Sequence, residues 1–270
     1  MRPLLILLAL ATGCARGSKA PAGARVVSLT PSATEVVAAL GATSMLVGVD
    51  DYSRYPPEVT KLPHVGSFLQ PNLEAIVRLH PTLVILDDVH GPTAQGLADA
   101  HVPTVECPMH ALADVRGALR AVGARLGKAR EADSQIAAID AALAAARDHR
   151  PAHHPRVLAI IDREAGGLGN STAAGPGSWL DDLLAAVGAD NVLAASPARY
   201  PKVSLETMLR AQPDVILDVS GQDPKAWSDL DVPAVKAGRV VALPQELFGG
   251  PTPRVAQALE QLGKIVRSSK

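Results

Sequence analysis

Polar and aromatic side chains stand directly after short apolar runs of the chain, or in loops punctuated by Pro or Gly. Ligands of open parallel sheets bind beyond the carboxyl ends of the strands, so these residues are candidates for a binding cleft. The candidates are Thr30, Ser32, Tyr52, Phe68, Asp87, Tyr200, Glu246 and Phe248. Aromatic rings beside hydroxyls and carboxylates suit a flat ligand with apolar faces and polar edges. The alternative for each ring is local packing beneath its own loop.

Further strand-end residues share this placement and enlarge the candidate set. They are Asp50, Asp51, Asp88, His90, Asp162, Arg163, Asp218 and Ser220. The pairs Asp50-Asp51 and Asp87-Asp88 predict an anionic rim. Such a rim disfavours an anionic ligand and accepts a ligand rich in amides, which both donate and accept hydrogen bonds.

Catalytic patterns fit the sequence poorly. Gly169-Asn170-Ser171-Thr172-Ala173 resembles a nucleophile elbow without its last Gly, and Gly167-x-Gly169 lacks the third Gly of a dinucleotide loop. A hydrolase or reductase using Ser171 or that loop is therefore a remote alternative. Cys107 follows a strand, which favours a buried free thiol over a metal ligand.

The histidines show neither an H-E-x-x-H motif nor paired spacing, so no metal site is expected. Those considered are His64, His80, His90, His101 and His110.

Two glutamates, Glu74 and Glu206, occupy the same position of an internal repeat. Segments 72–81 and 204–213 share Leu, Glu, Arg and Pro at one register, and each runs into an apolar strand. Two more pairs follow in the same order, 33–42 with 180–189 and 25–27 with 156–158. This order predicts two similar lobes. A helix dipole explains each acid alone, whereas their repetition suggests docking on a symmetric partner that carries Arg.

Each half alternates short β-branched runs with helical stretches. Strands are predicted at Val26–Leu29, Val47–Val49, Leu83–Leu86, Val102–Val105, Val157–Ile161, Val215–Leu217 and Val240–Leu243. Their continuous apolar character indicates mainly parallel sheets covered on both faces, hence an α/β fold. Helix starts are predicted at the capping box Ser32-x-x-Glu35 and at the N-caps Asn72 and Ser204. Gly41 and Gly188 are expected to end their helices.

A long alanine-rich helix is predicted between the halves, from Ala129 to Arg150. Its apolar stripe is Ala132, Ile136, Ile139, Leu143 and Ala146. At 1.5 Å per residue this helix spans roughly 30 Å, enough to brace two lobes, and one stiff helix is a poor hinge. The predicted organisation is a leader and tether (1–24), an N-terminal lobe (25–126), a linker helix (127–151) and a C-terminal lobe (152–270).

The N-terminus has the pattern of a secretory signal: Arg2, an apolar run from Leu4 to Leu10, then small residues. Ala9-Leu10-Ala11 fits ordinary cleavage after Ala11. Ala11-Thr12-Gly13-Cys14 resembles a bacterial lipobox, in which Cys14 is lipidated and anchors the protein outside the cytoplasm. The residues that follow Cys14 read as a flexible tether.

Composition limits the remaining classes. The chain has 270 residues, 47% hydrophobic and 20% charged, with a formal net charge of −1. This composition is globular, and the lack of a basic excess argues against a nucleic-acid partner. Two cysteines define neither a disulfide framework nor a multi-Cys zinc site.

Four stretches resemble the bilobal solute-binding proteins of ABC importers for cobalamin, haem and ferric siderophores, and most closely the cobalamin branch. They are Val26–Glu35, Gly48–Pro57, Val65–Glu74 and Tyr200–Glu206. The resemblance covers about residues 25–266. It implies two α/β lobes joined by one long helix, a ligand between them, and no enzymatic activity or resident cofactor.

The resemblance also implies roles for residues. Glu74 and Glu206 match the acids that dock on arginines of a permease dimer, which works with ATPase subunits, and the binding protein itself is monomeric. Tyr52 matches a corrinoid-contacting Tyr, and Phe68 and Tyr200 stand where Trp is common. Asp87 departs from an aromatic position, and Glu246 matches an acid near the ligand, with Phe248 close by. The expected cargo is therefore cobalamin.

The alternative cargo within this class is haem or a ferric siderophore. Tyr52 or His90 as an iron ligand would favour haem.

Overall fold

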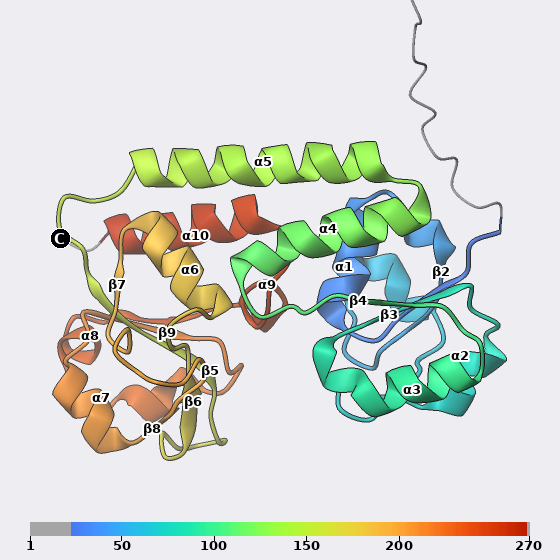
Figure 1. Ribbon diagram of the computed structural model, residues 1–270. Helices are drawn as coiled ribbons and strands as arrows, with labels where there is room; N and C mark the ends of the chain where they lie inside the picture. The colour runs from blue at the N-terminus through green and yellow to red at the C-terminus, as the bar shows by residue number, and fades with distance from the viewer. Residues whose placement is uncertain (1–22, 269–270) are drawn as a thin grey trace, which may run out of the picture.

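The structure is a computed structural model that describes residues 23–268 and contains two β-sheets. A long helix lies along one side of both sheets (Figure 1). The signal segment and Cys14 lie outside the described residues. Among residues 23–268, no helix combines the length and the apolar character that crossing a membrane requires.

The N-terminal sheet has four parallel strands in the order β2-β1-β3-β4. The strands are β1 (Val26–Ser28), β2 (Leu46–Val49), β3 (Leu83–Leu86) and β4 (Thr104–Glu106). The last of these begins two residues later than the predicted Val102–Val105. Pro103 lies inside the predicted run and lacks the N–H that a strand ladder needs.

Helices cover both faces of this sheet because successive strand residues point to opposite sides. Val26 and Ile85 pack with α1 (Pro31–Ala39) and α4 (Leu112–Leu126). Val27 and Val84 pack instead with α2 and α3. These two helices are α2 (Leu73–Arg78) and α3 (Gly91–Asp99), and the connections include η1 (Thr43–Met45), η2 (Pro57–Lys61) and η3 (Asp88–His90).

The C-terminal sheet has six strands, of which β10-β9-β5 form a parallel centre and β7 also pairs in parallel with β5. Strand β6 is antiparallel to both β5 and β8. The strands are β5 (Arg156–Asp162), β6 (Ser171–Ala173), β7 (Asp190–Asn191), β8 (Lys202–Val203), β9 (Val215–Asp218) and β10 (Val240–Ala242). The prediction of an α/β fold with mainly parallel sheets is confirmed. The sequence reasoning missed β6, β7 and β8, which are two or three residues long.

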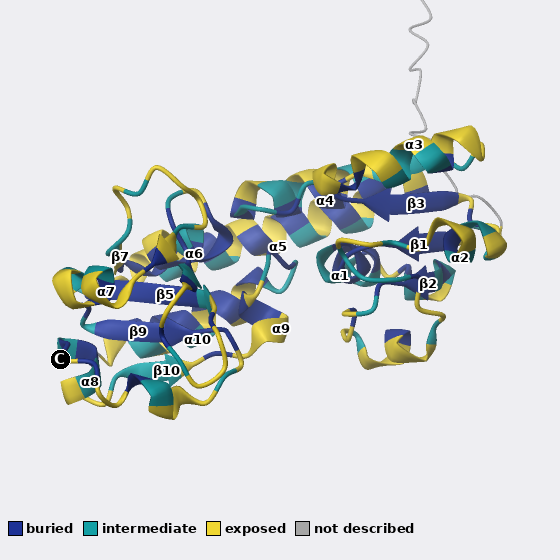
Figure 2. Ribbon diagram, turned by 90° about the horizontal axis from the view of Figure 1, so that it is seen from below, coloured by how far each residue is buried: buried dark blue, intermediate teal, exposed yellow. Residues whose placement is uncertain are grey.

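Strand β5 alternates between two cores. Val157 and Ala159 face the helices α6 and α10, whereas Leu158 and Ile160 face α7, α8 and Trp227. The helices of this half are α6 (Trp179–Val187), α7 (Leu205–Ala211), α8 (Pro233–Lys236), α9 (Gln245–Phe248), α10 (Val255–Arg267) and the short η4 (Pro224–Trp227). Figure 2 shows β1, β3, β5 and β9 as buried strands, flanked by helices that carry exposed residues.

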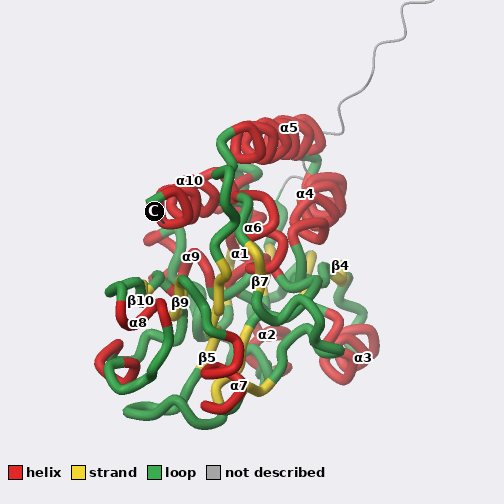
Figure 3. The backbone as a smooth tube through the Cα atoms, turned by 90° about the vertical axis from the view of Figure 1, so that its left-hand side faces the viewer, coloured by secondary structure: helices red, strands yellow, loops and turns green. Residues whose placement is uncertain are grey.

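Helix α5 (Ala129–Asp148) packs on helices from both halves. Viewed along the molecule, it lies above α4 on one side and α10 on the other (Figure 3). Ala132, Ile136, Ile139 and Leu143 of the predicted stripe are buried in one core cluster that also holds α1, α4, α6 and α10 residues. The helix is therefore supported along its length.

Helix ends follow the predicted chemistry with one exception. Asn72 and Ser204 cap α2 and α7, and Gly188 ends α6 in the left-handed region. The predicted capping box Ser32-x-x-Glu35 is wrong. Thr30 is the N-cap of α1 and accepts from the Ala33 N–H, which frees the Glu35 carboxylate for other partners.

Candidate ligand-binding cleft

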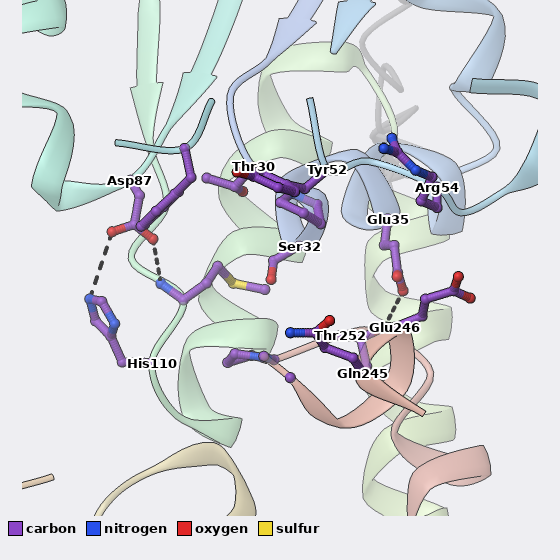
Figure 4. A pocket seen from close by; sticks show the side chains of 16 residues that line it. Thr30, Ser32, Glu35, Tyr52, Arg54, Asp87, His110, Gln245, Glu246 and Thr252 are labelled. Atoms are coloured by element: carbon purple, nitrogen blue, oxygen red, sulfur yellow. Dashed lines mark hydrogen bonds and ion pairs between the residues drawn. The ribbon is translucent and has the colours of Figure 1, made fainter. Parts of the chain in front are cut away.

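A cavity of about 480 Å³ opens beyond the carboxyl ends of the N-terminal strands. Its other wall is the segment around α9, which joins β10 to α10 (Figure 4). Six of the eight predicted ligand residues line it: Thr30, Ser32, Tyr52, Phe68, Asp87 and Glu246. The volume lies within the range of small-molecule sites.

A buried hydrogen-bond chain positions Tyr52 at the cavity. Thr34 Oγ1 donates to Ser28 Oγ at 2.9 Å and lies 2.8 Å from Ser53 Oγ, which in turn donates to Asp50. Asp50 Oδ2 accepts the Tyr52 N–H at 2.8 Å. Burial raises the pKa of Asp50, and the hydrogen bonds from Ser53 and Tyr52 oppose that rise. The chain ties β1, α1 and the loop after β2 together, and Tyr52 as a whole residue stays 60% exposed.

His90 supports Phe68 instead of facing a ligand. Its Nδ1 accepts from the Asp87 N–H at 2.9 Å, so Nε2 carries the proton and donates to the Phe68 carbonyl at 2.6 Å. The two rings meet edge to face at 5.3 Å. His90 is buried with both ring nitrogens engaged, so the expectation that it could ligate haem iron is wrong.

Asp87 and His110 stand together in the cavity wall. The His110 Nε2 lies 3.7 Å from Asp87 Oδ1 (Figure 4) and 3.0 Å from Asp88 Oδ1. Burial, with the neighbouring Asp88, raises the pKa of Asp87 to about 6. The sequence reasoning missed His110 because it sought paired histidines. Ligands of parallel sheets bind beyond the carboxyl ends of the strands. Applied to the loop after β4, beyond Cys107, this principle would have identified His110.

At the carboxyl ends of the C-terminal strands, the side chains of this lobe bind one another. Asp218 Oδ2 accepts from Arg163 Nε and from Trp227 Nε1, each at 2.8 Å, and its Oδ1 accepts from Ser220. Burial pushes the pKa of Asp218 up, but the hydrogen bonds from Ser220, Trp227 and Arg163 outweigh it, so that pKa is lowered. Arg163, Asp218 and Ser220 therefore serve this lobe's structure and do not line the cavity.

Glu35 joins the two halves at the back of the cavity. Arg254 donates to its two oxygens at 2.8 and 2.6 Å, and Thr252 donates to the same carboxylate. Arg254 also donates to the Glu246 carbonyl at 2.6 Å and lies 4.1 Å over the Tyr55 ring. This contact between α1 and the start of α10 sets the spacing of the cavity walls.

Two predicted ligand residues lie elsewhere. Phe248 is fully buried in the main core, because one side of the short helix α9 must pack inward, so its assignment to the ligand is corrected. Tyr200 lies beside the cavity without lining it, and its hydroxyl donates to the His110 carbonyl at 3.4 Å.

Glu74 and Glu206 are strongly exposed, at 82% and 80% of their side chains. Each pairs at 2.5 Å with an arginine one turn later, Arg78 or Arg210. Helices α2 and α7, which carry them, lie on the side of the molecule opposite α5 (Figure 1).

Ser171, the candidate nucleophile of the remote enzymatic alternative, and the separately considered thiol of Cys107 are both buried. Ser171 is buried and donates to the Leu168 carbonyl at 2.8 Å. Burial raises the pKa of the Cys107 thiol to about 12, as suits the predicted buried free thiol.

Two sheets bridged by a long helix, with a cavity between the ends of the N-terminal strands and the segment around α9, define a bilobal binding protein. The family described as "Periplasmic binding protein" matches residues 26–247. Because the match spans most of the chain, this protein belongs to that family of extracytoplasmic substrate-binding proteins. The prediction that it is not an enzyme is thereby confirmed.

Known proteins of similar sequence and structure agree with this family. The chain is 31% identical over 255 residues to a vitamin B12-binding protein of Salmonella typhimurium, covering 89% of each chain. Against a vitamin B12-binding protein of Pectobacterium atrosepticum, it is 29% identical over 250 residues, covering 88% of this chain and 86% of the relative.

Among solved structures, the periplasmic haem-binding protein RhuT from Roseiflexus sp. RS-1 has a TM-score of 0.81 at 30% identity, covering 92% of this chain and 99% of that one. The vitamin B12-binding protein BtuF of Vibrio cholerae has a TM-score of 0.74 at 25% identity, covering 91% and 97%.

Proposed function

We propose that the protein captures a corrinoid, with cobalamin as the first candidate, in the cleft between its lobes and delivers it to an ABC permease. The observation that carries this proposal is the lining of the cavity: the rings of Tyr52 and Phe68 stand with the hydroxyls of Thr30 and Ser32 and the amide of Gln245. A corrin ring offers flat apolar faces, and its amide edges both donate and accept hydrogen bonds. The names of the curated relatives support the same cargo.

The test is an absorption titration of the purified protein with cyanocobalamin, cobinamide, haem and a ferric siderophore. We expect one corrinoid per chain with a submicromolar Kd, because the walls are already formed and little ordering is needed. Absence of a submicromolar complex with either corrinoid removes the proposal.

Haem is a second candidate because Tyr52 and Arg54 both line the cavity. A tyrosine can ligate haem iron, and an arginine pairs with carboxylates such as the haem propionates. If haem is the cargo, Tyr52→Phe abolishes the Soret shift on binding, whereas Tyr55→Phe, a matched control in the neighbouring loop, keeps it. A Soret shift that survives Tyr52→Phe contradicts ligation by Tyr52.

Glu74 and Glu206 are proposed to contact the permease. Their strong exposure, their equivalent positions and their common side of the molecule support this role. The double variant Glu74→Ala/Glu206→Ala should keep cobalamin affinity and lose stimulation of the transporter ATPase. Glu260→Ala is the control, since it removes an exposed glutamate paired at 2.6 Å with Lys264 on α10, away from that side. Lost affinity with intact stimulation would place the acids in the cleft instead.

Cys14 is proposed as the lipidated residue that anchors the protein outside the cytoplasm. The lipobox-like segment Ala11-Thr12-Gly13-Cys14 supports this proposal. Cys14→Ser should release the protein from membranes, and the mass of the mature N-terminus distinguishes cleavage before Cys14 from cleavage after Ala11.

A further inference from the structure

Two carboxylates and an imidazole converge in the wall of the cleft. Asp87 directly follows β3, Asp88 begins η3, and His110 comes from the loop between β4 and α4. One ligand atom from each of the three lies within 4.8 Å of the others. Asp87 and His110 both line the cavity, so the cluster borders open space.

Asp87 carries a buried oxygen that lacks a hydrogen-bond donor. Its side chain is 3% exposed, and among residues 23–268 no N–H or O–H group donates to Oδ1. Its other oxygen, Oδ2, accepts the Met109 N–H at 3.1 Å. Oδ1 points toward His110 Nε2 (Figure 4). A buried acceptor without a donor is costly, so an additional positive group at this point would stabilise the site.

The spacing of the donors suits one metal ion. His110 Nε2 lies 3.0 Å from Asp88 Oδ1 and 3.7 Å from Asp87 Oδ1. Three donors at about 2.0–2.2 Å from a zinc ion, at angles between octahedral and tetrahedral, are about 3–3.5 Å apart. The third separation, between the Asp87 and Asp88 oxygens, is at most 4.8 Å, so the two carboxylates must approach each other by about 1.5 Å or less to coordinate one ion.

Backbone contacts hold the donors in place without an ion. The Asp114 carboxylate accepts the N–H groups of His110 and Ala111 at 3.0 and 2.8 Å, which fixes the loop. The Asp87 N–H is bound by His90 Nδ1. Such support from outside the ligand set is what metal sites use to orient their ligands.

We propose that Asp87, Asp88 and His110 form a binding site for a divalent transition-metal ion of the Zn²⁺ class in the N-terminal wall of the cleft. Mixed carboxylate and imidazole donors suit such ions. Three protein ligands leave a coordination position for water or for a donor atom of a ligand in the cavity.

The test uses the purified protein stripped with EDTA and titrated with Co²⁺ alone, followed by its visible absorption and by calorimetry. We expect one Co²⁺ per chain, displaced by Zn²⁺, and a rise in melting temperature with metal. Asp87→Asn preserves side-chain shape, and His110→Ala removes a partly exposed ring; each should weaken Co²⁺ binding by about 100-fold or more, since even supporting residues cost 10–100-fold. His154→Ala is the matched control, because it removes a surface imidazole that lies 3.4 Å from Asp190.

The proposal is overturned if Co²⁺ fails to bind at one per chain, or if Asp87→Asn and His110→Ala bind it as tightly as His154→Ala. Equal melting temperatures of all variants in EDTA show that the substitutions leave the fold intact. If Asp87→Asn has a lower melting temperature in EDTA, the Co²⁺ affinity of His110→Ala relative to His154→Ala decides the test. The titration contains neither corrinoid nor haem, so its outcome is independent of the proposed cargo.

Discussion

Asp50 in the N-terminal half and Asp218 in the C-terminal half both stand at the carboxyl end of a buried parallel strand, but their partners differ. Asp50 is held by Ser53 and the Tyr52 backbone, whereas Asp218 is paired with Arg163 and Trp227. The pKa of Asp50 is raised by burial, and that of Asp218 is lowered by its donors. The two similar halves therefore differ at their strand ends. In the C-terminal half, Arg163 neutralises the buried carboxylate. In the N-terminal half, the strand ends present their side chains to the cavity.

The largest expected effect is a loss of stability when the buried Arg163–Asp218 pair of the C-terminal half is broken. Arg163→Ala leaves the Asp218 carboxylate buried and without its cation, since the two side chains are 0% and 2% exposed. Removal of one partner of a buried pair costs about 3–5 kcal/mol of unfolding free energy, measured by urea denaturation. Arg116→Ala, which breaks a more exposed pair with Asp140, should cost less than about 1 kcal/mol. Equal losses in the two variants would contradict the contrast between the edges.

A smaller effect is expected where the halves meet. Arg254→Ala leaves the Glu35 carboxylate nearly buried with Thr252 as its remaining side-chain donor. Loss of hydrogen bonds to a charged group should cost about 2 kcal/mol, measured in the same denaturation series. A loss no greater than that of Arg116→Ala would show that this contact does not hold the halves together.

The next largest expected effect is on corrinoid affinity, which tests whether Tyr52 belongs to the wall that contacts the ligand. Tyr52→Ala removes an exposed ring from the cavity wall and should weaken corrinoid binding by about tenfold, or ~1.4 kcal/mol. Tyr200→Ala removes a ring that lies beside the cavity and should change affinity by less than about threefold. Absorption titration measures the affinity of both variants. A larger loss of affinity for Tyr200→Ala than for Tyr52→Ala would show that Tyr200, and not Tyr52, contacts the ligand.

The smallest effect concerns pH. A lowered pKa means that Asp218 adds stability above its unfolded value, near pH 4, and that this stability is lost as the pH falls through the folded pKa. The raised pKa of Asp50 acts oppositely: its contribution is full below about pH 4 and is lost as the pH rises through the folded value. Relative to the unsubstituted protein, Asp218→Asn should therefore become less stable as the pH rises from acid to neutral, and Asp50→Asn more stable. Parallel stability curves for the two variants would contradict these shifts.

Sequence patterns predicted the fold because buried strands, capping residues and an internal repeat are local signals. Asn72 and Ser204 cap the helices that the repeat predicts, and the stripe beginning at Ala132 marks the long helix. Strand ends also predicted five cavity residues, and the Gly-punctuated loop at Gly66 predicted the sixth, Phe68. These signals show at which end of the strands a residue lies. They therefore predicted most of the cavity wall that the N-terminal strands form.

The remaining site residues depend on contacts between distant segments. Glu35 has the spacing of a capping box, yet its partner Arg254 is 219 positions away. His90 and His110 look alike in sequence, and only the fold shows that Phe68 occupies one ring while the other faces the cleft. Phe248 lies two residues from Glu246, and about half a turn of helix between them sends its side chain inward.

The central claim is that cargo lies against the N-terminal wall and is covered by the segment around α9. A crystal structure of the protein with bound cyanocobalamin tests it most directly. We expect a corrin ring in contact with Tyr52 and Phe68 and bordered by residues 245–252. A corrinoid bound at any other surface, with this cavity left empty, would contradict it.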